Sequence, residues 1–241
     1  MNVNQIVRII PTLKVNNRKL NETFYIETLG MKTLLEESAF LSLGDQTGLE
    51  KLVLEEAPSM RTRKVEGRKK LARLIIKVDN PLEIEALLAK TDSIHQLYKG
   101  QNGYAFEIYS PEDDLVLIHA EDDRESLVEV EENPEFQTDL ESISLSKFEI
   151  SMELHLPTDV DSFLELSEVG ASLDFIPAQG QDLTVDNAVT WDLSMIKFLV
   201  NELDIASLRQ KFESTEYFIP KSEKFFLGKD RNNVELWFEE V

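Results

Sequence analysis

The chain has 241 residues, 42% of them hydrophobic, and a formal net charge of -21 at pH 7. This length accommodates one large domain or two of ordinary size, and the absence of cysteine excludes disulfides, thiolate zinc sites and cysteine nucleophiles. Because phosphate backbones and acidic lipid surfaces repel so negative a protein, we expect it to bind neither nucleic acid nor membranes.

Residues 5–15 (QIVRIIPTLKV) are predicted to be the first strand rather than part of a secretory signal. The N-terminus lacks a charged start, a long apolar stretch and a small-residue cleavage site. No apolar run approaches the roughly 18 residues that cross a bilayer. We therefore expect a cytoplasmic protein, which would reach the cell surface or exterior only by export without a signal.

One order of elements, a strand, a helix and three strands, recurs along the chain. The first copy, within residues 1–59, has a strand at 5–15, a helix at 17–30 that ends at Gly30, and strands at 32–37, 39–45 and 50–57. A basic connector at 60–70 follows, which we expect to be solvated. The second copy, within 68–123, has a strand at 71–78, a helix at 81–90, and strands at 94–100, 104–110 and 115–120.

An acidic linker at 124–143 precedes two further copies. The third has a strand at 147–158, a helix at 159–169 and a strand at 172–178, and is incomplete because 179–187 is too polar to continue it. The fourth has a strand at 191–200, a helix at 203–214, and strands at 216–220, 223–228 and 232–240. We predict an α+β fold in which tandem βαβββ modules pair into two cupped-sheet domains, residues 1–123 and 144–241.

Three stretches resemble the glyoxalase and bleomycin-resistance proteins of the vicinal-oxygen-chelate superfamily: LKVNNRKLNETFYIETLGMK (13–32), FEIYSPEDDLVLIHAE (106–121) and FLGKDRNNVELWFEE (226–240). The resemblance implies that each pair of modules cups a divalent metal held by a His from each first strand and a Glu from a final strand. The His positions fall on Ile10, Arg73, Ser151 and Ser194, and the Glu positions on Leu117 and Glu235. We therefore expect no metal and no other cofactor.

The length, the altered ligand positions, the acidic linker and the VELWFEEV terminus together resemble the CppA family of streptococci. This resemblance implies a proteinase that degrades host complement component three, which is thus the expected protein partner. The sequence contains no His-Glu-x-x-His helix and no Gly-x-Ser-x-Gly elbow to support proteolysis.

Strand alternation predicts which side chains face each cup, because neighbouring side chains point to opposite faces. The second cup is predicted to hold Glu149, Ser151, Glu153 and His155, then Ser194, Ile196 and Phe198, then Glu235 and Trp237. Ser151 and His155 lie roughly 13 Å apart along one strand, beyond hydrogen-bond reach. The candidates for a Ser-His-carboxylate centre are therefore Ser194, His155 and Glu235. A half-solvated sheet would give the same alternation without any chemistry.

The first cup is predicted to hold Ile10, Thr12 and Lys14, then Arg73, Ile75 and Lys77, then Leu115, Leu117 and His119. Its three cations suit a small anionic ligand, although their stems could equally cover apolar surface. His119 is expected to be partly exposed, and His95 to lie on the surface.

Three functions stay open at this point. They are a proteinase of complement component three, a binding protein that kept the cup and lost the metal, and a lyase or dioxygenase that holds a divalent metal through shifted ligands.

Overall fold

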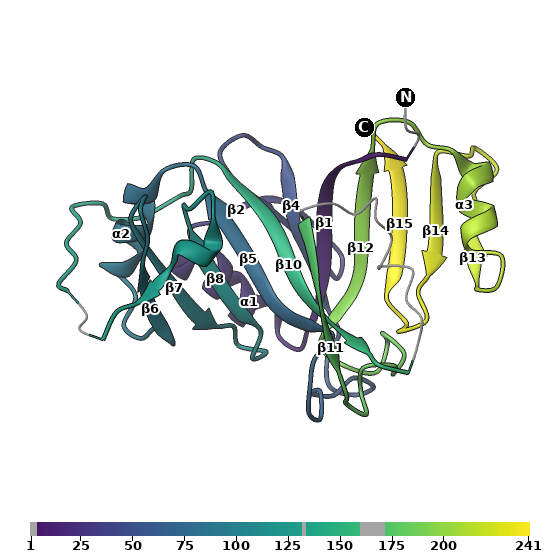
Figure 1. The fold of residues 1–241 in the computed structure, drawn as a ribbon, viewed down its shortest axis with the longest axis horizontal. Coiled ribbons are helices and arrows are strands. Elements are labelled where there is room, and N and C mark those ends of the chain that lie inside the picture. The colour runs from purple at the N-terminus through teal and green to yellow at the C-terminus, as the bar shows by residue number, and fades with distance from the viewer. Residues whose placement is uncertain (1–3, 132–133, 160–171) are drawn as a thin grey trace.

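The computed structural model describes residues 4–131, 134–159 and 172–241. Two mixed sheets lie side by side along the long axis of the molecule (Figure 1). Few helices accompany them, so the predicted α+β class is confirmed. No helix among the described residues is long and apolar enough to cross a membrane.

The large sheet has eight strands and joins the first module to the fourth. Its order is β13 (Tyr217–Phe218), β14 (Phe225–Lys229), β15 (Glu235–Glu240), β12 (Leu193–Val200), β1 (Ile6–Val15), β4 (Glu50–Glu56), β3 (Phe40–Gly44) and β2 (Lys32–Glu37). The two modules meet at its centre, where β1 runs antiparallel to β12.

The small sheet has seven strands and joins the second module to the third. Its order is β11 (Leu173–Ala178), β10 (Phe148–Pro157), β5 (Leu71–Val78), β8 (Leu115–His119), β7 (Tyr104–Tyr109), β6 (Gln96–Lys99) and β9 (Val128–Glu129). The antiparallel pair of β5 and β10 joins the two modules. The third module contributes only β10 and β11 within the described residues, and β9 comes from the acidic linker.

This pairing corrects the predicted contents of the cups. The first and second modules do not share a sheet, nor do the third and fourth, and both sheets draw strands from each side of the linker. The module sequences could not reveal this, because every first strand has a similar apolar alternation and can pair with any other. Asp192, at the start of β12, accepts hydrogen bonds from the backbone of Lys70 (2.6 Å) and Leu71 (3.2 Å) beside β5, and so ties one sheet to the other.

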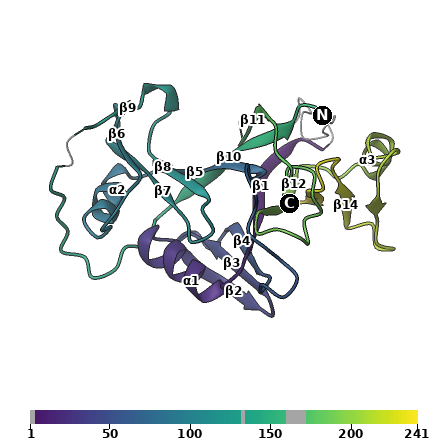
Figure 2. The same ribbon diagram turned by 90° about the horizontal axis from the view of Figure 1, so that it is seen from below.

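Each described helix begins where a side chain caps it. Asn17 caps α1 (Arg18–Thr23), which continues as a π-helical turn, η1 (Phe24–Thr28). Asn80 caps α2 (Pro81–Leu88), and Asp204 caps α3 (Ile205–Lys211). Figure 2 shows α1 beside β2, β3 and β4, and α3 at the far end of the large sheet. The helix predicted at 159–169 lies almost entirely outside the described residues.

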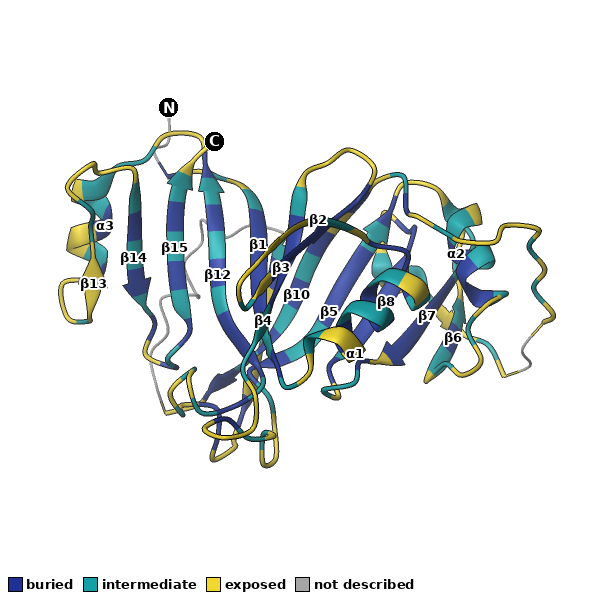
Figure 3. Ribbon diagram, turned by 180° about the vertical axis from the view of Figure 1, so that it is seen from behind, coloured by how far each residue is buried: buried dark blue, intermediate teal, exposed yellow. Residues whose placement is uncertain are grey.

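Gly30 ends the first helix as predicted, with φ +70° in the left-handed region that glycine tolerates. Figure 3 shows buried and less buried positions alternating along the central strands, most clearly in β12 and β15. The buried positions of both sheets belong to one hydrophobic core.

The basic connector is solvated only in part, because its C-terminal end is held against the fold while most of its other residues are exposed. Lys70 is only 1% exposed, and its amine donates to the Val185 carbonyl at 2.7 Å. Arg63 forms a bidentate ion pair with Asp182, in which each guanidinium nitrogen lies 2.7 Å from one carboxylate oxygen. Lys69 forms an ion pair with Asp114. These acids come from distant loops, so the connector's partners are carboxylates that only the fold brings to it. The linker is also partly ordered, through η2 (Arg124–Ser126) and β9.

Candidate functional site

The cup of the small sheet is filled by ion pairs. Arg73 on β5 lies 3.2 Å from Glu107 and 3.4 Å from Glu153, and Arg124 from the linker lies 3.1 Å from Glu153. The Tyr98 hydroxyl donates to Glu107 at 3.0 Å. Since each cation faces at least one carboxylate here, this cup is an internally neutralised network rather than an open anion site.

The other candidates in the small sheet are also engaged or apolar. Leu117 is 1% exposed, and Lys77 pairs with Asp122 at 2.6 Å. Ser151 lies beside Ile75 across the β5–β10 pair. His119 is buried, which corrects the expected partial exposure, and its Nδ1 accepts from the Glu121 backbone at 3.1 Å. Burial, with repulsion from Arg124 and Lys77, lowers the pKa of His119 to about 4, so its imidazole is neutral near pH 7.

The cup of the large sheet contains an open hollow of about 190 Å³. It lies over β1, β4, β3, β2 and β12, and its lining consists of Thr12, Leu35, Glu37, Phe40, Ser42, Glu50, Val53, Met195 and Lys197. Thr12 is 1% exposed, and its hydroxyl has no hydrogen-bond partner within the described part of the chain. A buried hydroxyl without a partner is costly unless a ligand or water completes it.

A polar network forms one side of this hollow. Glu50 accepts from the Ser42 hydroxyl at 2.6 Å and lies 3.2 Å from the Lys197 amine. Leu35, the cross-strand neighbour of Ser42, and Phe40 are 56% and 44% exposed. The hollow therefore combines exposed apolar side chains, a bonded Lys-Glu-Ser group, the Glu37 carboxylate and one unsatisfied hydroxyl.

Ser194 departs from its predicted position because β12 has a bulge. Thr12 pairs with Met195 and Leu13 with Leu193, so Ser194 is the extra residue between them. Its hydroxyl donates to the Thr12 carbonyl at 3.2 Å and lies 3.5 Å from Glu55.

Beyond the bulge the alternation of β12 is reversed relative to the prediction. Ile196 and Phe198, expected in the cup, pack in the hydrophobic core, where the Phe198 ring stacks on Phe238 at 4.9 Å. Met195 and Lys197 face the cup instead.

The three candidate catalytic residues are not brought together. His155 lies on β10 in the small sheet, with Nδ1 2.8 Å from the Lys69 carbonyl and Nε2 3.4 Å from Arg68. Ser194 and Glu235 lie in the large sheet, where Glu235 is beside Met195. The ring nitrogens of His155 thus face the backbone and an arginine rather than a serine, and no nucleophile-base pair forms from these three.

The cations predicted to share an anion pocket are also separated. Lys14 lies in the large sheet and pairs with Glu55 at 3.3 Å, whereas Arg73 and Lys77 lie in the small one. Ile10 is buried opposite Lys197 on β12. The pocket as predicted is not formed, because it required the first two modules to share a cup.

The residues at the expected ligand positions do not suit a divalent metal. Arg73, Ser151 and Leu117 occupy those of the small sheet, and Ile10, Ser194 and Glu235 those of the large sheet. Throughout the described ranges, no three His, Asp or Glu side chains gather into a group that could hold an ion.

Sequence reasoning missed Ser42, Glu50 and Lys197, the polar edge of the hollow. Lys197 lies between Ile196 and Phe198 and points to the opposite face of the strand. Because Ile196 and Phe198 are the more apolar set, the sequence alone could have assigned them to the core and Lys197 to the cup. The other two could not have been found, because their relevance depends on β1 pairing with β12 rather than with β5.

Comparison with solved structures places the fold in the glyoxalase-like class. A Bacillus subtilis protein described as a candidate dioxygenase superposes with a TM-score of 0.58 at 12% identity, over 99% of this chain and 86% of that one. Glyoxalase I from Zea mays superposes with a TM-score of 0.54 at 9% identity, over 97% and 92%. At these identities the likeness concerns the fold alone.

The chain belongs to the CppA family. The model of the CppA N-terminal region matches residues 8–130, and that of the CppA C-terminal region matches 145–238. The crystal structure of the cppA protein from Streptococcus pneumoniae TIGR4 is 90% identical, covers 100% of both chains and superposes with a TM-score of 0.96. None of the curated proteins compared with the chain matches it.

Proposed function

We propose that this CppA family member is a binding protein whose large-sheet cup receives a side chain of a protein partner without cutting it. The unpartnered Thr12 hydroxyl at the base of the hollow carries the proposal. A volume of about 190 Å³ is below the roughly 300–1,000 Å³ of sites for drug-sized molecules. It suits one side chain, and the exposed Leu35 and Phe40 offer apolar surface around it.

The preferred side chain has an apolar body and one hydrogen-bonding group. Val53 and Met195 would contact the body, and Thr12 would bond the polar group. Glu50 and Lys197 already neutralise one another, so the exposed Glu37 carboxylate is the remaining charge of the lining and disfavours a negatively charged ligand in this hollow.

Complement component three is the proposed partner, on the strength of family resemblance. The experiment is a binding titration of immobilised component three with the parent protein and with Thr12→Val, which keeps the side-chain shape and removes the hydroxyl. We expect about tenfold weaker binding for the variant, in line with the loss of one buried hydrogen bond. Thr138→Val, in the linker, is the matched control and should bind like the parent. Equal affinity of all three proteins would contradict the proposal.

Proteolysis of component three is the second candidate, supported by the same resemblance. It is tested by incubating the purified protein with component three and following fragments by electrophoresis. Parallel reactions contain Ser194→Ala, His155→Ala and Glu235→Ala, because a contaminating protease would ignore all three. Cleavage that any of these variants abolishes would favour an enzyme over the binding function.

A metal enzyme with shifted ligands is the third possibility, and elemental analysis tests it. A tightly held ion would give close to one equivalent per cup, whereas less than roughly a tenth of an equivalent per chain would exclude it.

A further inference from the structure

A second hollow lies at the outer end of the large sheet, and it is separate from the Thr12 hollow. It has about 260 Å³, and its lining consists of Glu216, Tyr217, Phe218, Leu227, Gly228, Lys229 and Glu235. These residues come from β13, β14, β15 and the turn before β13, all in the fourth module. It shares no lining residue with the first hollow.

Aromatic rings form a continuous row beside this hollow. The Phe225 ring stacks on Trp237 at 3.8 Å and lies 6.1 Å from Phe218, which is 56% exposed. The Trp237 indole N–H donates to Glu239 at 3.1 Å, so the ring is held in place. Ring faces of this kind attract cations and the alkyl stems that carry them.

The charge in the hollow is negative and incompletely paired. Lys229 is its cation, and that amine is engaged by Asp186 at 2.7 Å. Glu235 is half-buried and is the cross-strand neighbour of Lys229, but within the described ranges its carboxylate has no hydrogen bond or ion pair. Glu216 at the mouth is exposed. Adding Glu216, Glu235, Asp186 and Lys229 gives a net charge of -2 around the cavity.

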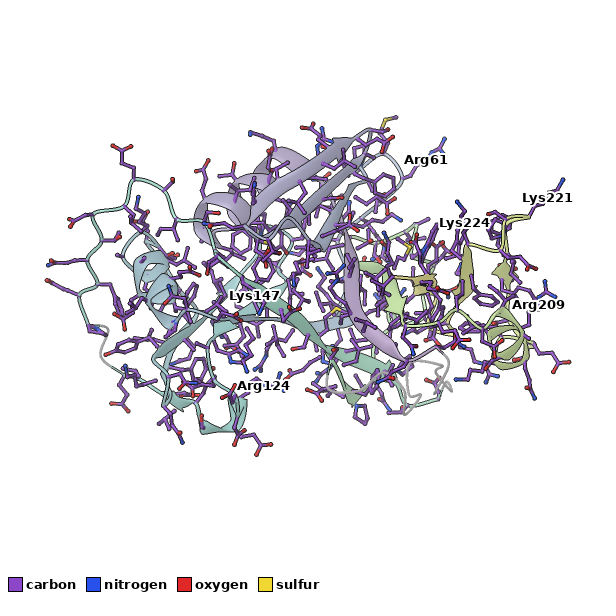
Figure 4. All side chains as sticks on the ribbon, turned by 90° about the horizontal axis from the view of Figure 1, so that it is seen from above. Arg61, Arg124, Lys147, Arg209, Lys221 and Lys224 are labelled. Atoms are coloured by element: carbon purple, nitrogen blue, oxygen red, sulfur yellow. The ribbon has the colours of Figure 1, made fainter. Side chains whose placement is uncertain are left out.

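The nearby cations do not reverse this balance. Figure 4 shows the labelled Lys221 and Lys224 at the outer end of the large sheet, with Lys221 pointing away from the body of the protein. Arg209 extends from α3 on the same end. These side chains belong to the β13–β14 turn and to the helix, and none of them lines the hollow.

We infer that this hollow is a binding site for the side chain of an arginine or lysine in an extended peptide segment of another protein. Phe218 and Leu227 would contact the alkyl stem, and Glu235 would accept hydrogen bonds from the charged head. Arginine fits better than lysine, because its planar guanidinium can stack on Phe218 while bonding both oxygens of Glu235. The inference does not rest on the Thr12 hollow.

The test uses the full-length protein and three capped heptapeptides of glycine and serine whose central residue is arginine, lysine or glutamate. Binding is followed by NMR shifts of the Gly228 and Glu235 amides at low salt. We expect the arginine peptide to shift both amides, the lysine peptide to bind more weakly and the glutamate peptide to leave them unchanged. Raising the salt concentration should weaken the binding.

Two variants and a matched control distinguish a built site from general attraction to an acidic protein. Glu235→Gln and Phe218→Ala should each weaken arginine-peptide binding by about tenfold or more, since one removes the charge and the other the ring. Glu213→Gln makes the same charge change on an exposed residue outside the hollow and should bind like the parent. Equal weakening by Glu213→Gln and Glu235→Gln, or shifts confined to other parts of the protein, would overturn the inference.

Discussion

Two buried carboxylates of this protein stabilise the contact between its two sheets. Asp192 accepts three backbone hydrogen bonds, from Lys70, Leu71 and Leu193, and so fixes the start of β12 beside the start of β5. Asp45, directly after β3, accepts a hydrogen bond from the Phe148 backbone at 3.0 Å. This bond holds the start of β10 beside the end of β3. Thr12 differs from both because its hydroxyl bonds nothing among the described residues. That contrast is why Thr12, and not these acids, marks a candidate binding site.

His119 predicts a specific pH dependence of stability. Its pKa in the folded protein is about 4, below the ordinary value of 6.5, so the unfolded chain binds a proton first as the pH falls. Above pH 6.5, His119 leaves the free energy of unfolding unchanged. Between pH 6.5 and pH 4, its protonation in the unfolded chain progressively lowers that free energy. The full shift corresponds to about 3 kcal/mol.

The measurement is urea unfolding at several pH values for the parent and for His119→Asn, whose amide oxygen can still accept from the Glu121 backbone. The parent should lose up to about 3 kcal/mol more than the variant between pH 7 and pH 4. The difference between the two proteins isolates His119 from the many carboxylates that titrate in the same range. Parallel curves would show that His119 is not buried as the structure has it.

At the scale of elements, the bulge in β12 decides what the large-sheet cup contains. Beyond the extra residue, Ser194, Ile196 and Phe198 lie in the hydrophobic core and Lys197 lies in the cup. Aromatic packing beside α3 stabilises this orientation of β12. The ring centroid of Phe212, at the C-terminal end of α3, lies 5.2 Å from that of Phe226 and 6.1 Å from that of Phe238. A strand shifted by one residue would bury Lys197 among these rings instead.

Gly228 on β14 tests this packing. A Cβ at Gly228 would lie 2.4 Å from the Phe212 ring, which is fully buried and has no room to move. Gly228→Ala should therefore destabilise the protein by about 1–3 kcal/mol, as overpacking of a core does. Thermal unfolding measures the effect. Gly180→Ala is the control, because its nearest contact would be a leucine side chain at 3.3 Å. Equal stability of both variants would mean that α3 is packed loosely.

At the scale of the whole molecule, each sheet is built from both halves of the chain. The first strand of the chain, β1, finds its antiparallel partner in β12, almost two hundred residues later, and β5 pairs with β10 across the linker. If the two halves were separated, β1, β5, β10 and β12 would become exposed apolar edge strands. Such edges associate readily with other chains. The two halves are therefore interdependent in their sheets.

This arrangement predicts that residues 1–131 and 144–241 do not fold separately. Expressed alone, each should give a poorly dispersed NMR spectrum or aggregate. Mixed at equal amounts, they should form a folded one-to-one complex on size-exclusion chromatography. A well-dispersed spectrum from either fragment as a monomer would contradict the prediction.

The sequence by itself determined the repeated βαβββ order, the approximate positions of the described helices, and the family resemblance. These properties depend on local alternation and on the Gly30 stop, and the Asn80 and Asp204 caps that the structure shows are local in the same way. The sequence also showed that Ile10, Arg73, Ser151 and Leu117, at the expected ligand positions, are not usual ligands of a divalent metal.

Only the tertiary structure decided which modules share a sheet, and hence which side chains share a cup. Strand pairing depends on contacts between residues far apart in sequence, and four similar first strands give no local preference among partners. The bulge at Ser194 had the same origin, since it exists only relative to β1. For that reason Thr12, Glu50 and Lys197 replaced the predicted Ser194, His155 and Glu235 as the centre of a candidate site, while Glu235 became part of a second one.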